Sequence, residues 1–159
     1  MINLIIIMGA GQDMEDDLLG FRPFANKMVE KYGVNFVAYA HDEDDLKEKI
    51  ELLEGTKIII GFSNGGHTLW NLDQDYKFES AIFLDPFPDW SSVWNFIKWC
   101  NPFYKYPTPI NAVEWICFYN YGKCFKDTAD NNPLNIEHEE FPSNNIVLKH
   151  IEGTIVEWK

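Results

Sequence analysis

Residues 58–70 read IIIGFSNGGHTLW, a β-branched strand that runs directly into a helix through the turn 61–65. The turn has the pattern G-x-S-x-G and the strand-turn-helix context that a nucleophile elbow requires. Glycines on both sides of Ser63 avoid clashes in so tight a turn, and the serine hydroxyl is lifted above the sheet edge. A serine that only caps the helix is the alternative, but a cap does not require two flanking glycines. We therefore predict that Ser63 is a nucleophile.

Size and charge limit the classes of protein to consider. The 159 residues are 46% apolar and 16% aromatic, which fits one domain with a full core. The net charge of −12 argues against nucleic acid and disfavours anionic membrane surfaces. The three cysteines, Cys100, Cys117 and Cys124, suggest neither a disulfide framework nor a metal site, so we expect a cytoplasmic protein. The apolar residues 1–8 are too few to span a bilayer.

Strands and helices alternate along the chain. The expected strands are residues 2–8, 34–40, 56–60, 80–84, 113–119 and 146–148. Amphipathic helices are expected around residues 21–32, 46–53 and 64–72. This order predicts one α/β domain over residues 1–159, in three α/β/α layers, with a mainly parallel sheet of about six strands. Functional residues then collect at the carboxyl ends of the strands.

The position of the serine after the third strand makes the chain resemble a minimal member of the α/β-hydrolase family. The resemblance covers about residues 2–150, and the elbow is its specific motif. It implies a serine hydrolase that cleaves a carboxylic ester, a thioester or an amide of a small molecule, without a cofactor. A catalytically silent protein that binds a small molecule or a protein partner is the alternative, because fold alone does not fix function.

The sequence offers four histidines for the general base. His41 precedes the serine, and His67 follows it by one helical turn, so we expect both to be structural. His138 lies in the polar stretch 136–140 with no expected strand to position it, and we expect it at the surface.

His150 is the preferred base. It directly follows the expected strand 146–148, which is where the resemblance implies a general base. Only residues 151–159 follow it, so the terminal helix that usually braces the family's histidine loop is expected to be short or absent.

Asp85 is the preferred acid of the triad. It ends the expected strand 80–84 and is followed by Pro86, which fixes the turn at the carboxyl edge of the sheet. The resemblance implies an acid one strand later in most family members, and after this strand in a minority that resemble pancreatic-type lipases. Asp127 and Asp130 are the competing acids, but they lie several residues beyond the next strand.

The resemblance also implies an oxyanion hole made of two backbone amides. One is the amide of Asn64, and the other comes from the loop after the first strand, from Ala10 or alternatively Gly11. Gly9 lets this loop approach a substrate closely. The glycine pair also resembles the start of a dinucleotide fingerprint, but Met14 stands where the third glycine belongs. We therefore expect no nucleotide cofactor, and no metal.

An aromatic insertion at about 86–109 is the second distinctive segment. It should contain a short helix opened by Ser91 or Ser92. Its aromatic residues are Phe87, Trp90, Trp94, Phe96, Trp99, Phe103, Tyr104 and Tyr106. Three interpretations stay open: an apolar lid that selects an acyl or aromatic substrate, additional core, or a homodimer face.

Overall fold

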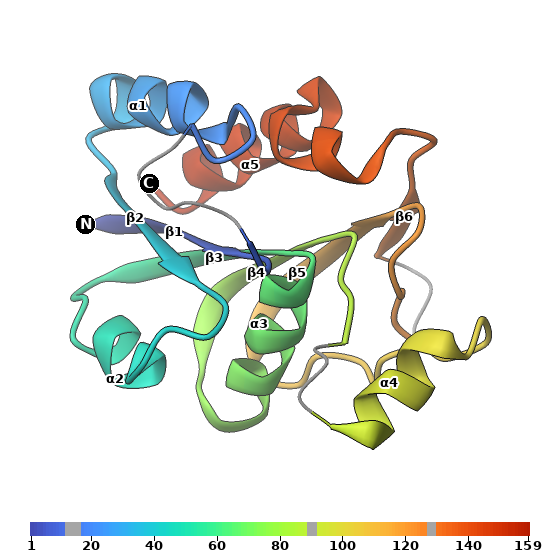
Figure 1. Ribbon diagram of the computed structural model, residues 1–159. Coiled ribbons are helices and arrows are strands. Elements are labelled where there is room, and N and C mark those ends of the chain that lie inside the picture. The colour runs from blue at the N-terminus through green and yellow to red at the C-terminus, as the bar shows by residue number, and fades with distance from the viewer. Residues whose placement is uncertain (12–16, 89–91, 127–129) are drawn as a thin grey trace.

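The computed structural model describes residues 1–11, 17–88, 92–126 and 130–159, and Figure 1 shows the arrangement of their elements. In these residues, six parallel strands form one sheet in the order β2-β1-β3-β4-β5-β6. The strands are β1 Ile2–Met8, β2 Asn35–Ala40, β3 Thr56–Phe62, β4 Phe78–Leu84, β5 Ala112–Tyr119 and β6 Asn131–Pro133. The predicted parallel α/β sheet is confirmed.

Helices cover both faces of the sheet. They are α1 Phe21–Tyr32, α2 Leu46–Glu51, α3 Asn64–Asp75, α4 Val93–Cys100 and α5 Asn145–Glu157, with a 3₁₀ helix η1 at His138–Ser143. Figure 1 shows α1 and α5 on one face and α2 and α3 on the other, with α4 on the α3 side. Among the described residues, none of these helices is both long and apolar enough to cross a membrane.

The core forms because side chains alternate between the two faces of each strand. In β1, Leu4, Ile6 and Met8 pack toward α1 and α5, whereas Ile5 and Ile7 pack toward α2 and α3. All five are fully buried, and burial of each such side chain contributes about 1.5–3 kcal/mol. The apolar runs recognised in the sequence are therefore strands buried on both faces.

The expected strand at 146–148 is wrong, because these residues open helix α5. Val147, Ile151 and Ile155 recur at the helical spacing of four and are all fully buried. Asn144 caps the helix, since its side chain accepts the backbone N–H two residues further on at 2.9 Å. The helix has 13 residues, so the expectation of a short or absent terminal helix is also wrong.

The edge strand β6 takes the sixth place in the sheet. It pairs in parallel with β5, with Cys117 opposite Asn131 and Tyr119 opposite Pro133. A proline is tolerated there because an edge strand leaves one row of N–H groups unpaired. The parallel direction brings the following chain to the carboxyl edge of the sheet, where β3 and β4 also end.

The aromatic insertion is only partly core. Tyr106 is fully buried, and its ring lies 5.5 Å from that of Phe125. Trp94 on α4 is 74% exposed. The predicted short helix is α4, which begins after Ser92, whose hydroxyl accepts the backbone N–H of Asn95 at 3.1 Å. Trp90 and the alternative cap Ser91 lie outside the described residues.

Candidate active site

The elbow holds Ser63 in a strained backbone conformation between β3 and α3. Its φ is 55° and its ψ is −122°, a region that non-glycine residues avoid and that costs about 1–3 kcal/mol. The Ser63 N–H donates to the carbonyl oxygen of Leu84 at 3.0 Å, and its carbonyl accepts from Phe87 at 3.0 Å. These bonds to the end of β4 keep the serine at the carboxyl edge of the sheet.

The glycines of the elbow are required by close backbone contacts. A Cβ on Gly65 would lie 2.0 Å from the carbonyl oxygen of Ile7, and one on Gly61 would lie 2.6 Å from that of Gly65. Neither space admits an alanine, so the G-x-S-x-G pattern reflects packing of α3 against β1 and β3.

The loop after β1 lies directly against the serine. A Cβ on Gly9 would lie 2.7 Å from the Cβ of Ser63, so only glycine fits there. Ala10 and Gly11 follow in this loop and are exposed. Asn64 is the first residue of α3, and the N–H groups of a first helical turn have no partner within their own helix.

Asp85 is fully buried at the end of β4 and accepts three hydrogen bonds. Its Oδ1 accepts the backbone N–H groups of Asn120 at 2.7 Å and of Gly122 at 2.6 Å. Its Oδ2 lies 2.6 Å from Nδ1 of His138. Position 122 is a glycine because a Cβ there would lie 2.4 Å from the Asp85 carbonyl carbon. The backbone thus fixes Oδ1 of this carboxylate, and the His138 side chain binds Oδ2.

The imidazole of His138 is held beside the elbow by ring contacts. It stacks on Phe62 with centroids 4.7 Å apart and meets the edge of Phe87 at 5.2 Å. Phe62 immediately precedes Ser63. An ionised carboxylate can only accept hydrogen bonds, so Nδ1 of His138 donates to Asp85. This leaves Nε2 able to accept a proton.

Helix η1 determines where the histidine lies. Glu137 and Glu140 form a capping box at its start, in which each side chain bonds the other residue's backbone. The Glu137 N–H donates to Oε2 of Glu140 at 3.0 Å. His138 is the first residue of this turn, and its side chain is 24% exposed. The expectation that His138 is a surface residue with nothing to position it is wrong.

His150 does not occupy the predicted position. It lies in the middle of α5, where its ring meets the edge of Phe118 at 5.5 Å and lines a cavity of about 190 Å³ with Glu114 and Thr154. Burial lowers the pKa of its imidazole. The predicted pairing of His150 with Asp85 is corrected, because the carboxylate of Asp85 is paired with His138.

Three further residues singled out in the sequence are Asp127, Asp130 and His67. Asp130 is exposed, and its carbonyl oxygen accepts the Cys117 N–H at 2.8 Å. Asp127 lies outside the described residues. His67 is buried with its Nδ1 3.2 Å from the Tyr106 hydroxyl, which fits the structural role expected for it. Within the part of the chain that is described, no cluster of three or more His, Cys, Asp or Glu could hold a metal.

Two solved structures that match this chain in fold are described as hydrolases. A pyrethroid hydrolase from Sphingobium faniae JZ-2 matches with a TM-score of 0.59 and 11% identity, covering 98% of each chain. A protein from Xanthomonas campestris pv. campestris, described as a hydrolase of the α/β superfamily, matches with a TM-score of 0.56 and 9% identity, covering 98% of this chain and 96% of that one. No protein-family model and no curated protein matches the sequence. The chain therefore has the α/β-hydrolase fold, as the resemblance implied.

Proposed function

We propose that the protein is a serine hydrolase that cleaves a carboxylic ester, with Ser63 as nucleophile, His138 as general base and Asp85 as the acid that orients it. One observation supports this most: the buried Asp85 carboxylate lies 2.6 Å from Nδ1 of an imidazole that stacks on the residue before Ser63. The α/β-hydrolase fold agrees with it but does not determine the reaction. The proposed substrate is a small molecule. Thioesters and amides are alternative substrates, because they undergo the same acyl-transfer reaction.

In this proposal the reaction proceeds through an acyl-enzyme. Nε2 of His138 takes the Ser63 proton as the hydroxyl oxygen attacks the ester carbonyl, and the imidazolium then protonates the leaving alcohol. Water then gives a proton to His138 as its oxygen attacks the acyl carbon. The imidazolium returns that proton to the Ser63 oxygen as the acyl bond breaks, which releases the acid and free Ser63. Asp85 stays ionised and stabilises the imidazolium.

The developing oxyanion is bound by backbone amides in this account. The N–H of Asn64 supplies the first hydrogen bond, and Ala10 in the loop against Ser63 supplies the second, with Gly11 as the alternative. The contact of Gly9 with Ser63 supports this assignment, because it brings the loop to the nucleophile. Removal of one such donor typically costs about 10²–10³-fold in kcat.

The test is the hydrolysis of short-chain p-nitrophenyl esters by four proteins. Wild type and His150→Ala should hydrolyse them at similar kcat, whereas Ser63→Ala and His138→Ala should lose about 10³-fold or more. Circular dichroism of each variant establishes that it is folded. The proposal is overturned if folded Ser63→Ala keeps its activity, or if His150→Ala loses activity while His138→Ala does not. Absence of turnover in wild type would favour a binding protein.

A further inference from the structure

Helix α4 and the loop after it expose large apolar side chains to solvent. The exposed fraction is 76% for Val93, 74% for Trp94 and 87% for Phe103. Phe96 and Ile97 are about half exposed, at 47% and 49%. Side chains of this kind, gathered on one short helix and its neighbouring loop, mark an interaction surface.

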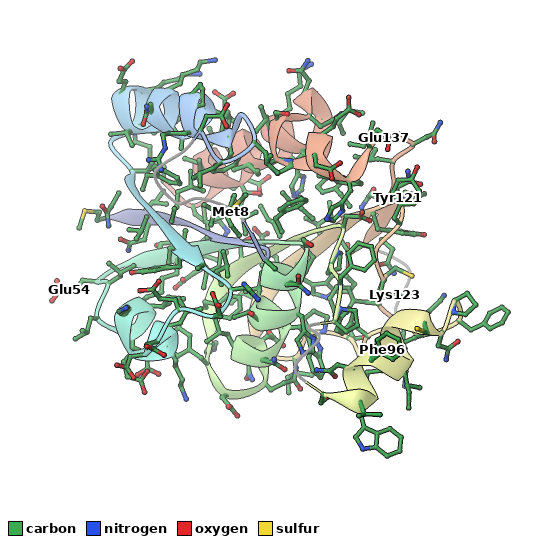
Figure 2. All side chains as sticks on the ribbon, in the orientation of Figure 1. Met8, Glu54, Phe96, Tyr121, Lys123 and Glu137 are labelled. Atoms are coloured by element: carbon green, nitrogen blue, oxygen red, sulfur yellow. The ribbon has the colours of Figure 1, made fainter. Side chains whose placement is uncertain are left out.

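Four lysines lie on helix α4 or beside it and its following loop. Lys98, Lys105 and Lys126 line a cavity of about 540 Å³ whose walls include Phe103. Lys123 lies beside α4, as Figure 2 shows, and its Nζ donates to the carbonyl oxygen of Asn101 at the end of that helix at 2.9 Å. We call the five apolar residues and these four lysines the α4 face.

The α4 face is cationic in an otherwise acidic chain. Between residues 86 and 127 the sequence has four lysines against Asp89, Glu114 and Asp127, whereas the whole chain has 25 acidic and 13 basic residues. Asp89 and Asp127 lie outside the described residues. The Glu114 carboxylate accepts the indole N–H of Trp158 on the α5 side at 2.9 Å, so it is engaged elsewhere.

Charge decides which partner suits this face. A second copy of the chain would place the same four lysines opposite one another, and like charges in contact disfavour association. An anionic partner removes that cost. Tryptophan and phenylalanine next to lysine are also the residues that enter the boundary layer of a bilayer, with lysine ammonium groups at the level of the phosphates.

We propose that the α4 face docks the protein peripherally on an anionic phospholipid membrane. Trp94 and Phe103 enter the interfacial layer, and the lysines contact lipid phosphates. The net charge of −12 predicts the opposite for the chain as a whole. However, carboxylates farther than about 8 Å from the lipid are largely screened at physiological ionic strength, so the local charge governs contact. This inference does not depend on the proposed catalytic activity.

Vesicle flotation tests the electrostatic part. Wild type should float with vesicles of phosphatidylcholine and phosphatidylglycerol, and not with phosphatidylcholine alone. Lys98→Gln/Lys105→Gln/Lys126→Gln should bind about 100-fold more weakly, from about fivefold per lysine. The control Lys27→Gln/Lys77→Gln/Lys149→Gln changes the net charge equally at exposed sites outside the face and should bind like wild type. Equal loss in both triple variants, or no binding by wild type, overturns the proposal.

A second pair of variants tests the apolar part. Trp94→Ala/Phe103→Ala should bind these vesicles at least tenfold more weakly, whereas Leu52→Ala/Val156→Ala, at exposed apolar positions on other elements, should not. Analytical ultracentrifugation of the same proteins identifies the competing occupant. A wild-type dimer that becomes monomeric in Trp94→Ala/Phe103→Ala would make the face a self-interface and overturn membrane docking.

Discussion

Two residues of the proposed triad have left-handed backbone conformations that only surrounding contacts can maintain. The φ angles are 55° at Ser63 and 43° at Asp85, each immediately after a strand. Each backbone N–H is bonded to the neighbouring strand, Ser63 to Leu84 at 3.0 Å and Asp85 to Phe118 at 2.7 Å. The hydrogen bonds to the sheet therefore offset a backbone strain of about 1–3 kcal/mol per residue. The same bonds place both side chains at one edge of the sheet.

Gly9→Ala tests how closely the first loop must approach the nucleophile. The added methyl would lie 2.7 Å from the Ser63 Cβ, so the loop or the serine must move. We expect esterase kcat to fall at least tenfold in a protein that still folds.

Gly153→Ala is the matched control. Gly153 is exposed on helix α5 and nothing lies within 4 Å of the added methyl, so activity should be unchanged and stability should rise by about 0.5–1 kcal/mol. Urea unfolding and ester kinetics measure both effects. Undiminished activity in Gly9→Ala would argue against a role for this loop beside Ser63.

At the residue scale, the sequence predicted where Ser63 and Asp85 lie, at the ends of two neighbouring strands, but it did not predict that His138 lies beside them. Ser63 and Asp85 were identifiable because a strand end fixes the next residue at the sheet edge. His138 is five residues beyond β6, and β6 itself is only Asn131–Pro133, without β-branched residues. Its position depends on pairing between distant segments, which local pattern does not reveal.

At the element scale, the capping box of η1 determines where the proposed base lies. Glu137→Ala removes this side chain from the start of the turn and should loosen His138. We expect kcat to fall about tenfold with little change in KM, since a cap contributes about 0.5–2 kcal/mol. Glu139→Ala, at the exposed neighbouring acid, is the control and should behave as wild type. If the two variants have the same kcat, the capping box does not position the base.

Helix α5 contains a half-buried histidine, His150, whose titration affects stability. Burial lowers the pKa of His150 below its usual value, and Glu114 and Glu157 partly oppose this. The unfolded chain therefore binds a proton at His150 more readily than the folded chain does. The contribution of neutral His150 to the unfolding free energy is present above about pH 6.5 and is lost as the pH falls. His150→Gln should flatten the fall in unfolding free energy between about pH 7 and 5. Parallel curves for the two proteins in urea would contradict this.

The same helix explains the error in the predicted strand. Ile146 and Val147 are β-branched and read locally as a strand. The cap at Asn144 and the spacing of Val147, Ile151 and Ile155 were the available signals for a helix. A run of three apolar residues is too short for its periodicity to distinguish a strand from a helix.

At the scale of the whole molecule, Asp73 joins segments far apart in the sequence. Its fully buried carboxylate accepts the backbone N–H groups of Ile110, Asn111 and Ala112 at 2.6, 3.1 and 2.7 Å, where the chain enters β5. Asp73→Ala should lower the unfolding free energy by about 3 kcal/mol or more, because three backbone N–H groups lose a charged acceptor. Asp75→Ala, at an exposed position, should change it by less than about 0.5 kcal/mol. Similar unfolding free energies for the two variants would show that the hydrogen bonds to Asp73 do not stabilise the fold.

The layered fold was predictable because it depends on strong local patterns. Long β-branched runs alternate with amphipathic helices, and parallel sheets follow from that alternation. The edge strand β6 and the exposure of α4 were not predictable. An aromatic helix reads as core by composition, but its partners are set by which elements pack beside it.

Fluorophosphonate labelling, followed by intact-mass measurement and peptide mapping, tests whether His138 and Asp85 activate Ser63. We expect a single adduct on Ser63 in wild type and in His150→Ala. We expect no adduct in Ser63→Ala, and labelling slowed by at least about 10²-fold in His138→Ala and Asp85→Asn. Wild-type labelling rates in a folded His138→Ala variant, or an unlabelled wild-type protein, would contradict this activation of Ser63.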